Sequence, residues 1–160
     1  MRWPEVDFKK REWTIPAERS KSNRKHIVPL PDAALDILDS LPRFGEGDHV
    51  FTTSDGRRPV SGFSRAKLRT DQMLAEHDTS IEGWRVHDLR RTCRTGMARL
   101  GVPEIVSERV LNHQAQGLAK VYNQHEYLAE KRAALDRWAQ EVMNIVEPPP
   151  ENVVKLKAKR

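Results

Sequence analysis

The chain has 160 residues, of which 38% are hydrophobic and 32% charged, and a formal net charge of +5. This length predicts one domain with a single core, and the basic balance favours a polyanionic partner such as nucleic acid. A single cysteine, Cys93, excludes an internal disulfide, and no apolar run is long enough to span a bilayer, so we expect a cytoplasmic protein.

A small antiparallel sheet is predicted near the start of the chain. Residues 13–17 alternate apolar and polar side chains, residues 20–25 form a polar turn, and residues 27–30 resume an extended run. A proline in each run confines these strands to sheet edges or strand ends. Residues 50–52 (Val-Phe-Thr) are the candidate for a third short strand. We therefore expect a sheet of about three strands.

Two helices are expected between this hairpin and residue 76. The first opens at Pro31-Asp32, and its predicted buried side consists of Ala34, Leu35, Ile37, Leu38 and Leu41. The second runs from Ser61 to about Glu76, with apolar positions at Phe63, Ala66, Leu68, Met73 and Leu74.

The best-defined helix starts near His87-Asp88. Its apolar face recurs at helical spacing, at Leu89, Cys93, Met97 and Leu100. Asp88 is the N-cap candidate and Gly101 the residue that ends the helix. Pro103 suits the first turn of the next helix, which is expected to run to about Leu111.

The last predicted helix carries an apolar stripe at Leu128, Leu135, Trp138, Val142 and Ile145. Three prolines at 148–150 end it, and a basic tail follows. We expect one domain over residues 1–146 and a disordered tail over 147–160. The fold class is α+β, mostly helical, with a small antiparallel sheet and a helical bundle.

Two tyrosines, Tyr122 and Tyr127, follow a cluster of histidine and arginine. Breaking a phosphodiester without metal or water requires a nucleophile, cations for the developing charge and an acid for the leaving oxygen. His87 and Arg90 are three residues apart and share one side of a helix. His113 follows in the next loop, and Tyr122 comes nine residues later.

At this point the chain resembles the tyrosine recombinase, or phage integrase, family. The string His87-Asp88-Leu89-Arg90-Arg91-Thr92 is similar to the family's His-x-Leu-Arg-Arg/His-Thr box. Leu111-Asn112-His113 resembles its Leu-Gly-His box with asparagine in place of glycine, and Val121-Tyr122 resembles the nucleophile segment. Trp3, Val6-Asp7 and Val28-Pro29-Leu30 are similar to the strands that carry the family lysine. The resemblance covers about residues 1–140. Within the family, the chain especially resembles integrases of temperate phages and genomic islands.

The resemblance implies a role for each matching residue. Tyr122 would attack the scissile phosphate and form a 3′-phosphotyrosyl link, while Arg90 would bind the non-bridging oxygens. Lys21, in the hairpin turn, would protonate the departing 5′-oxygen. His87 would assist proton transfer, and His113 would hydrogen-bond the phosphate. Double-stranded DNA is the implied partner, with Arg19, Arg24 and Arg91 as further contacts, and no metal or other cofactor is implied.

One departure leaves activity open. The family's first arginine precedes the Trp-Ser/Pro-Asp/Glu stretch, whereas here Met1 stands just before Trp3, so we expect this chain to lack that arginine and the amino-terminal DNA-binding domains. Two hypotheses follow: an enzyme or enzyme fragment that recombines DNA, and a catalytically inactive DNA-binding remnant of an integrase. A third takes residues 87–111 as the helix-turn-helix of a regulator, although a regulator has no use for Lys21 or Tyr122.

Each residue also has a plainer interpretation. A histidine and an arginine at the start of a basic helix usually form a solvated face, and Lys21 suits any polar turn. His113 can satisfy helix-end carbonyls, and Tyr122 can be a buried aromatic. Tyr127 is the fallback nucleophile. The final helix is expected to be core or a surface for self-association.

Overall fold

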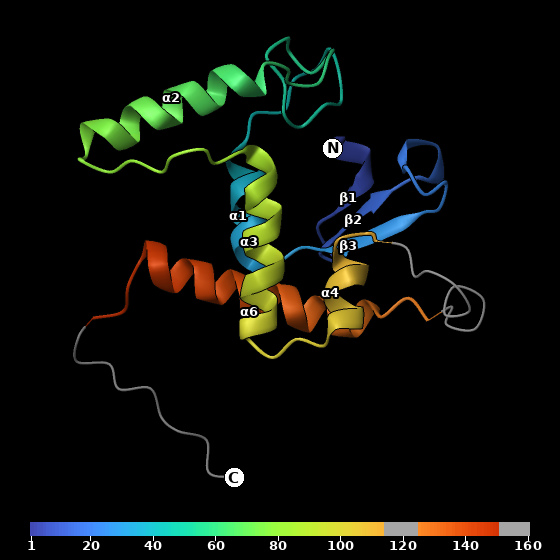
Figure 1. Ribbon diagram of the computed structural model, residues 1–160. Helices are drawn as coiled ribbons and strands as arrows, with labels where there is room; N and C mark the ends of the chain where they lie inside the picture. Colours follow the sequence, from blue (N-terminus) through green and yellow to red (C-terminus); the bar gives the residue numbers. More distant parts are fainter. Residues whose placement is uncertain (114–124, 151–160) are drawn as a thin grey trace.

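The computed structural model describes residues 1–113 and 125–150, arranged as Figure 1 shows. A small antiparallel sheet and a larger set of helices make up the expected α+β fold. The strands are β1 (Val6–Asp7), β2 (Glu12–Ile15) and β3 (His26–Pro29). The helices are α1 (Asp32–Ser40), α2 (Phe63–Glu76), α3 (Val86–Arg99), α4 (Glu104–Val110) and α6 (Leu128–Val146). A short 3-10 turn, η1 (Trp3–Glu5), precedes β1, and a second one, η2 (Ala17–Arg19), follows β2.

The sheet has the order β1-β2-β3, and both strand pairs are antiparallel. Trp13 in the central strand pairs with Val6 on one side and Val28 on the other. The predicted hairpin is confirmed, but the prediction of a third strand at residues 50–52 is wrong. The third strand is β1, which is too short to show an alternating pattern. Residues 50–52 form no strand, although Val50 is buried in the apolar cluster next to the sheet.

The helix boundaries agree with the sequence, but three expectations about side chains are wrong. Ile37 is 60% exposed and Leu89 is 62% exposed, because α1 and α3 pack on only part of their apolar faces. Asp88 is not the N-cap of α3, since the helix begins one residue before His87 and its N-cap is Arg85. Asp88 instead occupies the third helical position, where its carboxylate accepts the main-chain N–H of Arg85 at 2.7 Å.

A tight connection turns the chain between α3 and α4. Gly101 has φ +74°, a left-handed conformation that glycine adopts without steric cost, and it ends α3 as predicted. Pro103 is the N-cap of α4, one position before the expected first turn. Val102, between them, is buried together with Met97 and Val106. The two helices therefore lie against each other with His113 just beyond the end of α4.

The buried apolar side chains form two clusters. One lies between α3, α4 and α6 and contains Met97, Val102, Val106 and Ala134. The other lies between the sheet and α1 and is built on Leu30, Leu38 and Val50. Helix α6, drawn in orange in Figure 1, joins them, because it contacts β3, α4, α3 and α1. It thus serves as a common support for the elements that carry the candidate site.

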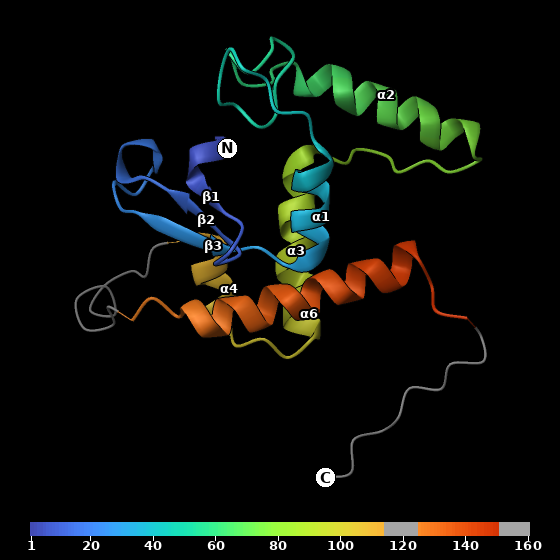
Figure 2. The same cartoon turned by 180° about the vertical axis from the view of Figure 1, so that it is seen from behind.

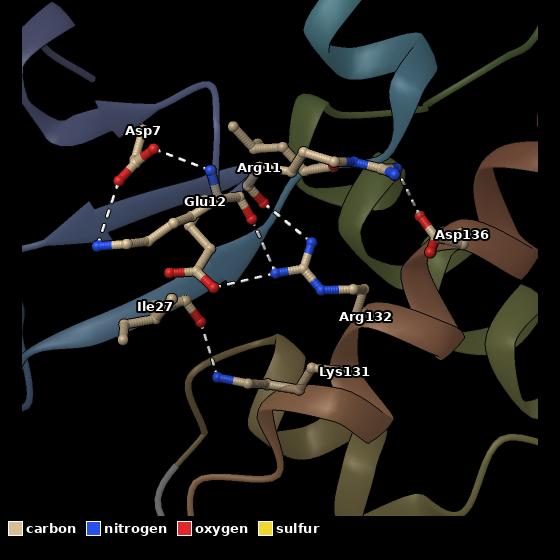
Figure 3. Close-up of polar contacts among 9 residues, drawn as sticks. Asp7, Arg11, Glu12, Ile27, Lys131, Arg132 and Asp136 are labelled. Atoms are coloured by element: carbon tan, nitrogen blue, oxygen red, sulfur yellow. Dashed lines mark hydrogen bonds and ion pairs between the residues drawn. The ribbon is translucent and has the colours of Figure 1, made fainter.

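Polar contacts attach the first turns of α6 to the hairpin, as Figure 3 shows. Lys131 is only 4% exposed, and its Nζ donates to the carbonyl of Ile27 in β3 at 2.7 Å. Arg132 donates to the carbonyls of Lys10 and Arg11 and to the Glu12 carboxylate. These bonds satisfy backbone carbonyls at the edge of the sheet, so α6 and the hairpin are held in one relative position.

Helix α2 projects from the rest of the fold, at the end far from α6 (Figures 1 and 2). Its connection to α3 is held by one polar cluster: Asp71 accepts from Lys67 Nζ at 2.6 Å and from Trp84 Nε1 at 2.8 Å. The ammonium group of Lys67 also lies 4.8 Å from the centre of the Trp84 ring. The segment that leads into α3 is therefore anchored to α2. Within the described residues, no helix combines the length and apolar character needed to cross a membrane.

Candidate functional site

The first turns of α3 carry His87 and Arg90 on neighbouring positions of one helix side. His87 is exposed, whereas Arg90 is partly buried. The Arg90 guanidinium donates through Nη2 to the carbonyl of Leu111, at the end of α4. A guanidinium has five N–H donors, so this bond fixes the side chain and leaves donors for a pair of anionic oxygens.

The end of α4 sets the position of His113. The main-chain N–H of Asn112 donates to the carbonyl of Arg109, and the main-chain N–H of His113 donates to the carbonyl of Glu108. These two bonds form a Schellman motif. This motif requires a left-handed residue after the helix, and Asn112 has φ +56°. Asparagine tolerates that conformation better than most residues other than glycine. Asn112, which replaces the glycine of the Leu-Gly-His pattern, therefore adopts the left-handed backbone conformation that this turn requires.

The side chain of His113 is held by the same helix turn. Its Nδ1 lies 2.5 Å from Oε2 of Glu108, and the other carboxylate oxygen of Glu108 accepts from Nε of Arg94 at 2.6 Å. Arg94 extends from α3 and also donates to Glu104 at 2.6 Å. Burial raises the pKa of Glu108, but hydrogen bonds from Arg94 and His113 lower it, and the net pKa is below the ordinary value. Glu108 is therefore an ionised link between α3 and His113.

The hairpin that carries Lys21 meets this corner of the molecule. The buried Ser20, adjacent to Lys21, accepts a hydrogen bond through Oγ from Nδ2 of Asn112 at 3.3 Å. Lys21 itself is exposed. Glu5 fixes the other side of the hairpin, since its carboxylate accepts from the Trp13 indole at 3.1 Å and pairs with Arg19. The chain segments around Lys21 and His113 are thus joined directly.

Arg90 lies within electrostatic reach of the buried His26 and the half-buried Cys93. Burial lowers the pKa of His26 in β3, and the positive charges of Lys131 and Arg90 lower it further. Burial raises the pKa of the Cys93 thiol, and Arg90 opposes that rise. Both side chains therefore favour their neutral forms.

The predicted DNA contacts lie on the hairpin segment and on α3. Arg19 pairs with Glu5, Arg91 pairs with Asp88 at 2.8 Å, and Arg24 is exposed in the hairpin turn. Tyr122 lies outside the described residues. Tyr127, the fallback nucleophile, is the N-cap of α6 and packs against the cluster that contains Met97.

Two residues of this corner were not predicted from sequence. Glu108 is five residues before His113, beyond the spacing at which helix side chains are usually paired, and it reaches His113 only because the chain turns at Asn112. Ser20 lies 92 positions from Asn112, and its burial gives no local signal. The Leu-Asn-His string was the only sequence feature that pointed toward either contact.

The chain is similar to phage and prophage integrases. Residues 1–128 match the phage integrase family. The chain is 34% identical over 141 residues to the prophage integrase IntA of Escherichia coli (strain K12), covering 86% of this chain and 33% of the relative. It is 29% identical over 148 residues to the prophage integrase IntZ of the same organism, with 91% and 35% covered. It is 28% identical over 160 residues to the integrase of Enterobacteria phage P4, with 86% and 34% covered. The chain spans about a third of the length of these relatives. No solved structure matches it significantly.

Proposed function

The chain belongs to the phage integrase family of tyrosine recombinases, and from this premise we propose that it acts in site-specific DNA recombination by breaking and rejoining DNA strands. Tyr122 is the proposed nucleophile. Arg90, His87, His113 and Lys21 are the residues proposed to act on the phosphate and the leaving group. Double-stranded DNA is the substrate.

One observation carries this proposal: three segments far apart in the sequence converge on one corner. Arg90 of α3 donates to the backbone at Leu111, and Asn112 bonds to Ser20 in the hairpin. The family boxes and the hairpin lysine segment are thus joined by direct contacts. A helix-turn-helix regulator would require only α3 and α4, and it would not account for the attachment of the hairpin to the end of α4.

The proposed reaction is a transesterification that conserves the phosphodiester. The phenolic oxygen of Tyr122 attacks phosphorus and gives up its proton to His87, and the bond from phosphorus to the 5′-oxygen breaks. Lys21 delivers a proton to that oxygen, which leaves as a 5′-hydroxyl, while the phosphate stays on Tyr122 as a 3′-phosphotyrosyl ester. Arg90 stabilises the charge that develops on the non-bridging oxygens, because its planar fork donates two parallel hydrogen bonds. Attack of another 5′-hydroxyl reverses these steps and rejoins the strands.

DNA binding is proposed to depend on backbone phosphate contacts from Arg19, Arg24 and Arg91. Two of these arginines already hold a carboxylate, Glu5 or Asp88, so a phosphate would replace or share that partner. Contacts of this kind release condensed counterions, and binding should weaken steeply as salt increases. A chain that binds DNA in this way without cleaving it would fit the inactive-remnant hypothesis.

The test is covalent trapping on a pool of nicked suicide duplexes, in which the cleaved end diffuses away and rejoining is blocked. We expect a protein–DNA adduct with the wild-type chain and none with Tyr122→Phe. Tyr127→Phe is the matched control, and it should form the adduct at the wild-type level. Loss of the adduct in Tyr127→Phe alone would move the nucleophile to that residue. DNA binding at low salt with no adduct in any variant would refute the enzymatic proposal and support a DNA-binding protein without cleavage activity.

A further inference from the structure

We infer that Glu108 is a positioning residue for His113: it fixes the orientation and the protonated nitrogen of the imidazole so that Nε2 is presented to the DNA phosphate. The inference rests on the proposed function, because it assigns a partner to one of the residues proposed to contact that phosphate. It concerns a residue outside the family boxes found in the sequence.

His113 is attached to Glu108 at two points. The main-chain N–H of His113 donates to the Glu108 carbonyl at 2.9 Å, and its Nδ1 lies 2.5 Å from Glu108 Oε2. The backbone bond fixes the position of the His113 Cα, and the side-chain bond restricts rotation of the ring about χ1 and χ2. A histidine held at both ends retains one ring orientation, whereas one held only by the backbone samples several rotamers.

The carboxylate is itself held from α3. Arg94 donates to Glu108 Oε1 and to Glu104 Oε1, each at 2.6 Å, so it contacts two carboxylates spaced one turn apart on α4. Arg94 thereby orients the second oxygen of Glu108 toward the end of the helix, where His113 lies. Its positive charge also offsets a carboxylate that would otherwise repel a nearby phosphate.

Glu108 decides which nitrogen of His113 is available to substrate. A carboxylate oxygen only accepts hydrogen bonds, so Nδ1 must carry a proton to bond with it. Free neutral histidine has no such constraint, and either nitrogen can carry the proton. With Nδ1 occupied, Nε2 is the nitrogen left for a phosphate oxygen, and it donates when the ring is doubly protonated. Partners of this kind set the tautomer of histidines that bind metals and act in triads.

A purely structural role for the same contacts makes a different prediction. If Glu108 only joined α3 to α4 through Arg94, its loss would reduce stability and leave the His113 ring unchanged. Glu104 supplies the matched control, since it lies on α4 like Glu108 and bonds to the same Arg94 side chain, whereas the His113 ring pairs with Glu108. Glu108→Met and Glu104→Met both remove a carboxylate from Arg94 and keep a straight-chain helix former.

The first measurement is the ring ¹⁵N spectrum of His113, assigned by the signal that disappears in His113→Gln. We expect Nδ1 to be protonated in the wild-type chain and in Glu104→Met. In Glu108→Met the signals should shift toward a mixture of tautomers. Glu108→Gln should restore the wild-type pattern in part, because its side-chain oxygen can still accept from Nδ1–H. An unchanged His113 spectrum in folded Glu108→Met, or an equal change in Glu104→Met, would overturn the inference.

The second measurement is the rate of covalent adduct formation on the nicked duplex. Glu108→Met should lower the maximal rate about tenfold, the lower end of what loss of a histidine's orienting partner costs at other sites. The DNA concentration at half-maximal rate should stay unchanged, and Glu104→Met should react like wild type. If wild-type chain forms no adduct, the proposed function fails while the ¹⁵N spectra still decide whether Glu108 sets the His113 ring.

Discussion

Gly96 of α3 packs against Trp138 of α6, and replacing it with alanine should destabilise the protein. A Cβ at this position would lie 2.0 Å from Cζ3 and 2.6 Å from Cη2 of Trp138. Nonbonded carbon atoms prefer separations of about 3.5–4.0 Å, so the indole would have to move by more than about an ångström. Trp138 packs against the cluster of Met97, Val102, Val106 and Ala134, and its displacement disturbs that cluster.

Two opposing effects set the size of the change. Alanine is favoured over glycine inside a helix by about 0.8–1.0 kcal/mol, which would stabilise α3 in isolation. Overpacking a filled contact costs about 1–3 kcal/mol, and we expect the upper part of that range here, about 2–3 kcal/mol, because a rigid ring cannot yield as easily as a flexible chain end. We therefore expect Gly96→Ala to lower the free energy of unfolding by about 1–2 kcal/mol, which corresponds to a fall in Tm of about 3–6 °C for a chain of this size.

The assay is urea unfolding followed by far-ultraviolet circular dichroism, in a double-mutant cycle with Trp138→Leu. In the Trp138→Leu background the steric conflict is absent, so Gly96→Ala should become neutral or stabilising. The coupling between the two positions should then exceed about 1 kcal/mol. A stabilising effect of Gly96→Ala in the wild-type background, or the same loss in both backgrounds, would refute the steric explanation.

Two further predictions concern His26 and Asn112. The pKa of His26 in the folded chain is below its unfolded value of 6.5, so between these two pKa values the unfolded chain binds more protons than the folded chain. The free energy of unfolding should therefore fall as the pH drops below 6.5, until the pH passes the lowered pKa. His26→Gln should flatten the stability profile from about pH 8 to about pH 5, measured by urea unfolding, and a profile unchanged by the substitution would contradict the assignment. Asn112→Ala should be less stable than Asn112→Gly by about 1 kcal/mol, because φ +56° is costly for alanine and not for glycine. Equal stability of these two variants in the same assay would show that the left-handed turn is not required.

Local features were predictable where several signals agreed. For α3, the apolar spacing and Gly101 indicated the same helix, and its observed range differs by about one residue, although Asp88 proved to be the third helical residue and not the N-cap. The hairpin was predicted from alternation on both sides of a polar turn. Strand β1 was missed by periodicity because two residues cannot show a period, although the family resemblance pointed to the same segment.

Burial was less predictable, because it depends on which face another element covers. The apolar side chains of Ile37 and Leu89 fit their helical stripes and yet are exposed. Lys131 was the opposite case, a charged residue in an amphipathic helix that is almost fully buried, because the open carbonyl of Ile27 lies opposite it. No pattern in α6 alone could indicate a partner 104 residues away.

The sequence by itself determined the fold class, the family and the order of the boxes that contain Arg90 and His113. These follow from local propensity and from motif residues at short spacings, which depend on neighbours along the chain. Only the tertiary structure joined Ser20 to Asn112 and revealed Glu108 as the partner of His113. Such contacts arise when packed helices and a tight turn bring distant or out-of-phase side chains within hydrogen-bonding distance, and that proximity depends on the assembled core.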